Sequence, residues 1–73
     1  MSRLVREAWG RNIIARREEL GITQRGLADA VGVSVPSVSR WETGTSAPKD
    51  EHKVKVATAL NLDVRFLFPL VAA

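Results

Sequence analysis

The sequence contains no cysteine, no tyrosine and a single histidine, His52. Without cysteine there can be no disulfides, thiolate metal ligands or cysteine nucleophiles, and this composition suits a reducing compartment. His52 has no carboxylate or second histidine at metal-ligand spacing, so we interpret it as a surface residue and expect no metal site. With so few catalytic side chains, and no carboxylate pair in an evident pocket, we expect neither an enzyme nor a cofactor.

Long apolar runs are also missing. No stretch approaches the roughly 18 apolar residues that cross a bilayer, and the N-terminus lacks the apolar core of a secretory signal. We therefore expect a cytoplasmic protein with no membrane contact. The 73 residues suffice for one domain with a small core, which leaves no room for a separate domain that binds a small-molecule ligand.

The sequence does have a modest excess of positive charge. Lysine and arginine number 11 against 8 for aspartate and glutamate, which gives a net charge of +3. Every basic residue before Gly44 is an arginine, whose planar fork of donors matches phosphate groups and guanine edges. This excess suits a polyanionic partner, although a merely solvated surface can carry similar charge.

The spacing of apolar residues predicts an all-α fold of five helices and no strands. Trp9, Ile13 and Leu20 recur on one face of the first helix, and capping residues or glycines mark the ends of the later ones. Pro36 falls in the first turn of the third helix, where its missing N–H costs nothing. The predicted helices cover about residues 7–20, 24–31, 35–43, 49–60 and 64–67.

The second and third helices are short and joined by a turn centred on Gly32, an arrangement that can place a helix in the major groove of DNA. Residues at fixed spacing surround this turn: Ile13, Arg17, Gly21, Thr23, Gln24, Leu27, Ala28, Gly32, Val33, Ser34, Val38, Ser39, Arg40, Trp41, Glu42, Gly44, Pro48, Ala57, Leu60 and Leu67. Through them the stretch 10–68 resembles the Cro/repressor-type (XRE-like) helix-turn-helix family. The resemblance implies a compact five-helix, lambda-repressor-like DNA-binding domain that spans 1–73, with its core at about 7–68 and its motif at about 24–43.

The third helix should present one face to DNA. At about 100° per residue, Val38 and Trp41 point one way. The opposite face is shared by Val35, Pro36, Ser39, Arg40 and Thr43. The resemblance implies base contacts from that second face, through Val35, Pro36, Ser39 and Arg40. Arginine can bind guanine O6 and N7 together, whereas valine and proline offer only apolar contact suited to a thymine methyl. We therefore expect G and T at adjacent positions of the target; the alternative is that Arg40 is simply a solvated helix residue.

Other polar residues are candidates for contact with the phosphate backbone. Gln24 opens the second helix, where its side chain and the unpaired N–H groups of the first turn can hold a phosphate oxygen. The resemblance implies this role for Gln24, and the further candidates are Thr23, Arg25, Ser37, Thr43 and Thr45. Such contacts set the register of the protein on DNA without reading the sequence. The alternative for Thr23 is that it only caps the helix.

Arg17 lies within about 40° of Ile13, on the face of the first helix that should be buried, and a charge there needs a partner. The resemblance implies a structural ion pair between Arg17 and Glu42 that ties the first helix to the third. Three positions depart from the family pattern. Gly26 lies inside the second helix, and Asp50 and Lys53 stand where the fourth helix is usually apolar, which leaves the start of that helix open.

The C-terminal segment is rich in apolar residues. On a short helix, Val64 and Leu67 share one face and should close the core, which leaves Phe66 and Leu70 on another face. An exposed aromatic residue beside a leucine suggests a dimer interface, and a two-fold dimer would bind a pseudo-palindromic operator. The alternative is a monomer in which Phe66 folds back onto Trp9.

These features together predict a sequence-specific transcriptional regulator that binds double-stranded DNA. Because the chain is short, we expect it to act by operator occupancy, as a small Cro-like repressor or a phage or plasmid immunity repressor does. The alternative is an antitoxin-like or restriction-controller subunit of the same fold that also binds a protein partner.

Overall fold

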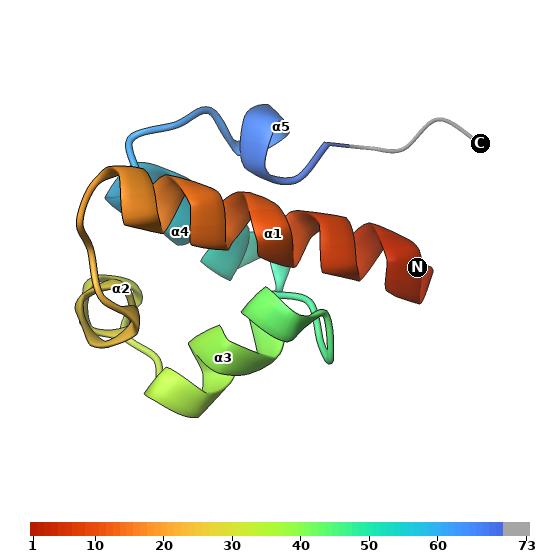
Figure 1. Cartoon of the computed structure of the whole chain (residues 1–73), viewed down its shortest axis with the longest axis horizontal. Helices are drawn as coiled ribbons and strands as arrows, with labels where there is room; N and C mark the ends of the chain where they lie inside the picture. Colours follow the sequence, from red (N-terminus) through yellow and green to blue (C-terminus); the bar gives the residue numbers. More distant parts are fainter. Residues whose placement is uncertain (70–73) are drawn as a thin grey trace.

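The computed structural model of this protein describes residues 1–69 and consists of five helices. They are α1 (Arg3–Glu19), α2 (Gln24–Val31), α3 (Val35–Thr43), α4 (Asp50–Ala59) and α5 (Val64–Leu67). Every regular element in this range is a helix, so the predicted all-α class is confirmed. In Figure 1, α1 crosses the middle of the molecule, with α5 on one side of it and α3 on the other. No helix within residues 1–69 is long and apolar enough to cross a membrane.

Capping side chains set most of the helix boundaries. Thr23, Ser34 and Asp63 each accept a hydrogen bond from a backbone N–H of the helix that follows. The residues before position 7 extend the predicted first helix, because Ser2 provides a cap and α1 begins at Arg3. The start of α4, which the sequence left open, lies at Asp50. No side chain caps this helix, and its acidic first turn complements the helix dipole.

A single apolar cluster, to which all five helices contribute, forms the core. Its buried members are Trp9, Ile13, Leu27, Ala28, Val31, Val38, Trp41, Val56, Ala57, Leu60, Leu67 and Phe68. The rings of Trp9 and Phe68 meet edge to face, with centroids 5.4 Å apart. The alternative that Phe66 packs onto Trp9 is therefore wrong. Phe68 takes that place directly after the single turn of α5, and Phe66 is 74% exposed.

Two polar residues of α4 cover aromatic rings. The ammonium group of Lys53 lies 4.3 Å from the ring centroid of Trp9, and the Lys53 side chain is only 17% exposed. His52 is half-buried, with its ring centroid 5.7 Å from that of Trp41. His52 thus stays partly exposed at the surface, and α4 lays its side chain against the aromatic residue of α3.

Polar side chains of α1 bind the C-terminal ends of other helices. Arg6 Nε donates to the carbonyl of Gly44 at 3.1 Å, and Arg16 Nε donates to the carbonyl of Leu60 at 2.9 Å. These are the residues that end α3 and α4, where carbonyls lack helical partners and positive charge is favoured. Asn12 makes a similar bond to the Leu67 carbonyl at 3.0 Å. α1 therefore organises the fold through hydrogen bonds as well as apolar contacts.

Candidate nucleic-acid interface

A tight turn joins α2 to α3. Gly32 ends α2 with a φ of 85°, a left-handed conformation that glycine adopts without steric cost. The N–H groups of Gly32 and Val33 both donate to the carbonyl of Ala28, at 2.8 and 3.0 Å. Ser34 then caps α3. The two helices are thus connected by only three residues, and the buried side chains of Ala28 and Val38 fill the angle between them.

The outer face of α3 carries the predicted base-contact residues. Arg40 and Pro36 are exposed, and Ser39 is half-buried. The guanidinium of Arg40 makes no hydrogen bond or ion pair with any residue in the described range 1–69. Val35 differs from the expectation because it is half-buried and packs partly against the core, so less of its side chain is available to a ligand.

Hydroxyl groups cluster at both ends of α3. At the C-terminal end, the Thr43 and Thr45 hydroxyl oxygens are 2.8 Å apart, and Thr43 Oγ1 also donates to the carbonyl of Arg40. At the N-terminal end, the hydroxyl oxygens of Ser34 and Ser37 are 3.0 Å apart. The structure therefore places three of the candidate backbone-contact residues, Ser37, Thr43 and Thr45, beside the face that carries Arg40.

The start of α2 holds the other candidates. Thr23 caps the helix, since its Oγ1 accepts the N–H of Gly26 at 2.9 Å, and Arg25 is exposed. Gln24 is half-buried, and its Nε2 donates to Glu42 Oε1 at 2.8 Å. The sequence predicted a phosphate contact for Gln24 and gave no sign of a partner inside the fold. Sequence reasoning missed this bond because the two residues are 18 positions apart and no local pattern links them.

Arg17 and Glu42 form an ion pair in the structure. Arg17 Nε donates to Glu42 Oε2 at 2.8 Å, and Arg17 Nη2 donates to Glu42 Oε1 at 3.3 Å. The exposed fractions of the two side chains are 15% and 4%. The hydrogen bond to Glu42 raises the pKa of Arg17 above its ordinary value, so this guanidinium stays charged. The pair joins α1 to α3 directly behind the face that carries Arg40.

A short helix, a tight turn and a second helix with a polar outer face define a DNA-binding protein of the helix-turn-helix class. The sequence profile of the helix-turn-helix family matches residues 13–67. The chain belongs to this family, whose members are DNA-binding transcriptional regulators.

Relatives and solved structures agree with this assignment. The chain is 38% identical over 63 residues to YazB, an uncharacterised HTH-type transcriptional regulator of Bacillus subtilis, with 86% of this chain and 91% of YazB covered. Two other curated relatives are longer, and the chain spans 44% and 38% of their lengths.

Among solved structures, the P22 c2 repressor in complex with a synthetic operator matches with a TM-score of 0.81 and 34% identity, over 84% of this chain and 92% of the repressor. The restriction-modification controller C.AhdI from Aeromonas hydrophila matches with a TM-score of 0.82 and 28% identity, over 86% and 96% of the two chains.

Proposed function

We propose that this protein represses transcription by occupying a pseudo-palindromic operator, as a small Cro-like or immunity-type repressor. The observation that carries the proposal is the outer face of α3, where Arg40 is exposed and makes no bond within the described residues. The similarity to the P22 c2 repressor, which was solved in complex with a synthetic operator, supports operator binding by this protein. A protein with this role works in the cytoplasm, where it has access to DNA.

The proposed interface has two kinds of contact, to the bases and to the sugar-phosphate backbone. Arg40 binds a guanine edge, Pro36 and the exposed part of Val35 meet a thymine methyl, and Ser39 supplies one more polar contact. The second group holds the sugar-phosphate backbone and consists of Thr23, Gln24, Arg25, Ser37, Thr43 and Thr45. These residues fix the position of α3 in the groove, while the first group reads the sequence.

Arg40→Ala tests the base-reading role. Loss of a bidentate guanine contact should weaken operator binding by about 1–3 kcal/mol and relax the preference at one base pair of each half-site. Selection of binding sites from random DNA, followed by affinity measurements on the selected site, reports both effects. Arg25→Ala is the matched control. It should weaken binding to all sequences alike and reduce the magnitude of the slope of log K against log salt by about 1 for each bound subunit.

If the two variants exchanged these outcomes, the proposed docking would be wrong. Wild-type affinity that did not change between low and physiological salt would contradict DNA binding itself, because phosphate contacts release counterions.

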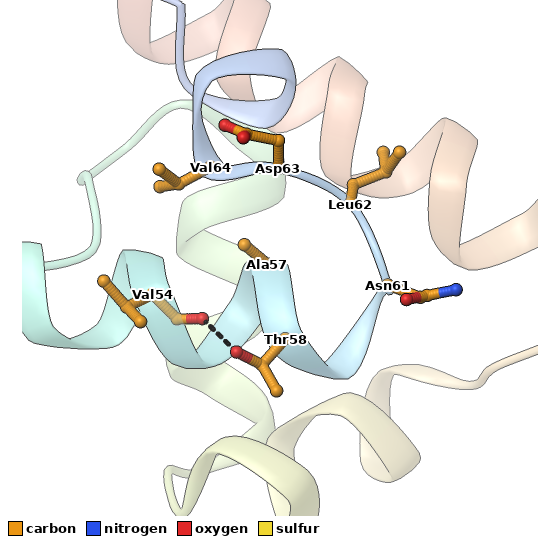
Figure 2. Close-up of a pocket in the computed structure, with 7 residues that line it drawn as sticks. All are labelled: Val54, Ala57, Thr58, Asn61, Leu62, Asp63 and Val64. Atoms are coloured by element: carbon orange, nitrogen blue, oxygen red, sulfur yellow. Dashed lines mark hydrogen bonds between the residues drawn. The ribbon is translucent and has the colours of Figure 1, made fainter.

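We further propose that two copies bind the operator together through the end of the molecule that carries α5. Phe66 is 74% exposed there, and Leu70, the second residue expected at this interface, lies outside the described residues. A groove of about 590 Å³ runs beside α5, lined by residues of α4 and of the segment that leads into α5 (Figure 2). Val54, which lines this groove, is 58% exposed. An exposed ring and a groove that is lined in part by apolar side chains suit contact with a second copy.

The similarity to C.AhdI favours a second candidate function, control of a restriction-modification operon. Both candidates use the same DNA-binding surface and differ only in the gene that is regulated. Mapping the bound sites on the genome of the source organism separates them. A site upstream of restriction or methyltransferase genes would support the second candidate, and a site among prophage or plasmid genes would support the first.

A further inference from the structure

Glu42 is the buried charged residue that links three helices. It is the one charged side chain in the described range that is almost fully buried, with 4% of the side chain exposed. Its Oε2 accepts Arg17 Nε of α1 at 2.8 Å, and its Oε1 accepts Gln24 Nε2 of α2 at 2.8 Å. One carboxylate on α3 thus holds side chains from both neighbouring helices.

The bond to Glu42 fixes the orientation of the Gln24 amide. A carboxylate can only accept hydrogen bonds, so the NH₂ group of the amide, and not its oxygen, must face Glu42. The NH₂ group has two hydrogens, and Glu42 uses one of them. No other hydrogen bond of this group is formed within residues 1–69. The second N–H is therefore available to an acceptor outside the protein.

Arg17 makes this arrangement compatible with a phosphate nearby. A buried carboxylate alone would repel a phosphate, but the guanidinium of Arg17 neutralises it with two hydrogen bonds. Arg17 Nη1 also donates to the carbonyl of Ile22 at 3.0 Å, which fixes the chain just before α2. The pair therefore positions both the backbone at the start of α2 and the side chain of its first residue, Gln24.

We propose that Glu42 is a positioning residue for DNA binding, which holds the Gln24 amide so that its second N–H donates to a phosphate oxygen. The inference rests on the proposed DNA-binding function. An unrestrained glutamine side chain loses conformational entropy when it binds a phosphate. Because Glu42 already orders the Gln24 side chain in the free protein, this cost of binding is smaller. Because Glu42 belongs to α3, the same contact keeps the phosphate anchor on α2 at a fixed distance from the base-reading face of α3.

The first test uses NMR on the free protein, where Gln24 supplies the only glutamine side-chain amide. We expect this amide to be as rigid as that of Asn12, which donates to the Leu67 carbonyl, and more rigid than that of Asn61, an exposed residue. On addition of operator DNA, only the Gln24 amide proton that is not bonded to Glu42 should shift strongly. An amide as mobile as that of Asn61, or a strong shift of the Glu42-bonded proton, would overturn the proposal. This test needs no substitution.

The second test is a double-mutant cycle with Glu42→Gln, which leaves one acceptor oxygen for the donors of both Arg17 and Gln24. Gln24→Ala should weaken operator binding about tenfold in the wild-type background and less than about threefold in the Glu42→Gln background. Ser37→Ala is the control, since Ser37 is a candidate backbone contact that does not touch Glu42. Its effect should be the same factor in both backgrounds.

The outcomes distinguish this inference from the function on which it rests. The inference would be overturned if Gln24→Ala had equal effects in both backgrounds, or if the effect of Ser37→Ala also differed between them. Either result would show that Glu42 only supports the fold, while DNA binding itself would stand. Failure of the wild-type protein to bind any DNA would overturn the proposed function and the inference together.

Discussion

At the scale of a single residue, Lys53 is a charged side chain that packs against the apolar core. Its ammonium group faces the ring of Trp9 at 4.3 Å and pairs with Asp50, 3.3 Å away. The Asp50 side chain is fully exposed, so that ion pair contributes little. The four-carbon stem of Lys53 is buried while its charge lies over an aromatic face. The length of this stem therefore lets a lysine stand at a position that is usually apolar.

Substitution of Lys53 can separate the contribution of the stem from that of the charge. Lys53→Met keeps most of the buried stem and should change the free energy of unfolding by less than about 1 kcal/mol. Lys53→Ala removes the stem as well and should cost about 2 kcal/mol. Urea denaturation of the two variants measures both quantities. Equal losses would mean that the charge on the ring, and not the apolar stem, stabilises α4 here.

Individual arginines have different roles, so net charge alone is a poor indicator of a DNA-binding surface. Arg6, Arg16 and Arg17 make hydrogen bonds inside the fold, to carbonyls that end helices or to Glu42. Arg25 and Arg40 remain exposed on the two helices of the motif. The positions of Arg25 and Arg40 on the motif therefore indicate a nucleic-acid partner more directly than the net charge of the sequence does.

At the scale of elements, the crossing of α1 and α3 depends on a glycine. A Cβ atom on Gly10 would overlap the carbonyl oxygen of Glu42 and lie 2.6 Å from that of Trp41. Gly10 lies in the middle of α1, where glycine weakens a helix by about 0.5–1 kcal/mol relative to alanine. The close approach of the two backbones offsets that cost.

Gly10→Ala should therefore destabilise the protein although it improves helix propensity. We expect a loss of about 1–3 kcal/mol, as overpacking commonly causes, and a melting temperature lower by roughly 5–20 °C. Gly26→Ala is the matched control inside α2, because its Cβ would meet only side-chain atoms, at 3.3 Å. It should change stability by less than about 1 kcal/mol. A Gly10→Ala variant as stable as wild type would show that α1 and α3 can separate without cost.

The features that sequence predicted well are local ones. Thr23, Ser34 and Gly32 mark helix ends within a few residues of the backbone groups that they satisfy, so their pattern is visible in the chain. The role of Gly10, the Gln24 bond to Glu42 and the choice of Phe68 over Phe66 for the core depend on how distant helices meet. Periodicity says which face of a helix is apolar, but it does not say which backbone approaches that face.

The cap of α5 makes this element sensitive to acid. Asp63 accepts hydrogen bonds from the Arg65 side chain at 3.1 Å and from the Arg65 N–H at 2.8 Å, and these bonds lower the pKa of the carboxyl. A carboxyl whose pKa is depressed in the folded state stabilises that state above its unfolded pKa of about 3.9, and the stabilisation is lost as the pH falls through the folded value. α5 should therefore loosen as the pH falls through that lowered pKa.

The Arg65 amide resonance reports this change in an NMR titration. It should move as Asp63 is protonated, at a pH below the usual aspartate range, and Phe68 and Leu67 should follow because α5 holds them in the core. Asp63→Asn is the control. Asparagine caps helices about as well but does not titrate, so its Arg65 resonance should stay in place over the same range. A shift of equal size in that variant would assign the acid response to another group.

At the scale of the whole molecule, the position of α5 would set the geometry of the proposed dimer. α5 and α3 lie on opposite sides of α1, along the vertical direction of Figure 1, in which the protein measures 22 Å. Two copies that meet at α5 would carry their α3 helices toward opposite outer edges, less than twice that distance apart. The separation of about 34 Å between successive major grooves on one side of DNA falls within this limit.

Phe66→Ser tests whether this surface joins two copies. Burial of an exposed phenylalanine in an interface contributes on the order of 1.5–3 kcal/mol for each copy, so its loss should shift a weak dimer to monomer. Light scattering with and without operator DNA should give the mass of a dimer for wild type, at least on DNA, and that of a monomer for Phe66→Ser. Leu4→Ser is the control, because Leu4 is 77% exposed on α1, outside the proposed interface. It should leave the mass unchanged. A wild-type protein that binds a single asymmetric half-site as a monomer, with no effect of Phe66→Ser, would show that each copy reads DNA alone and that the exposed ring serves another purpose.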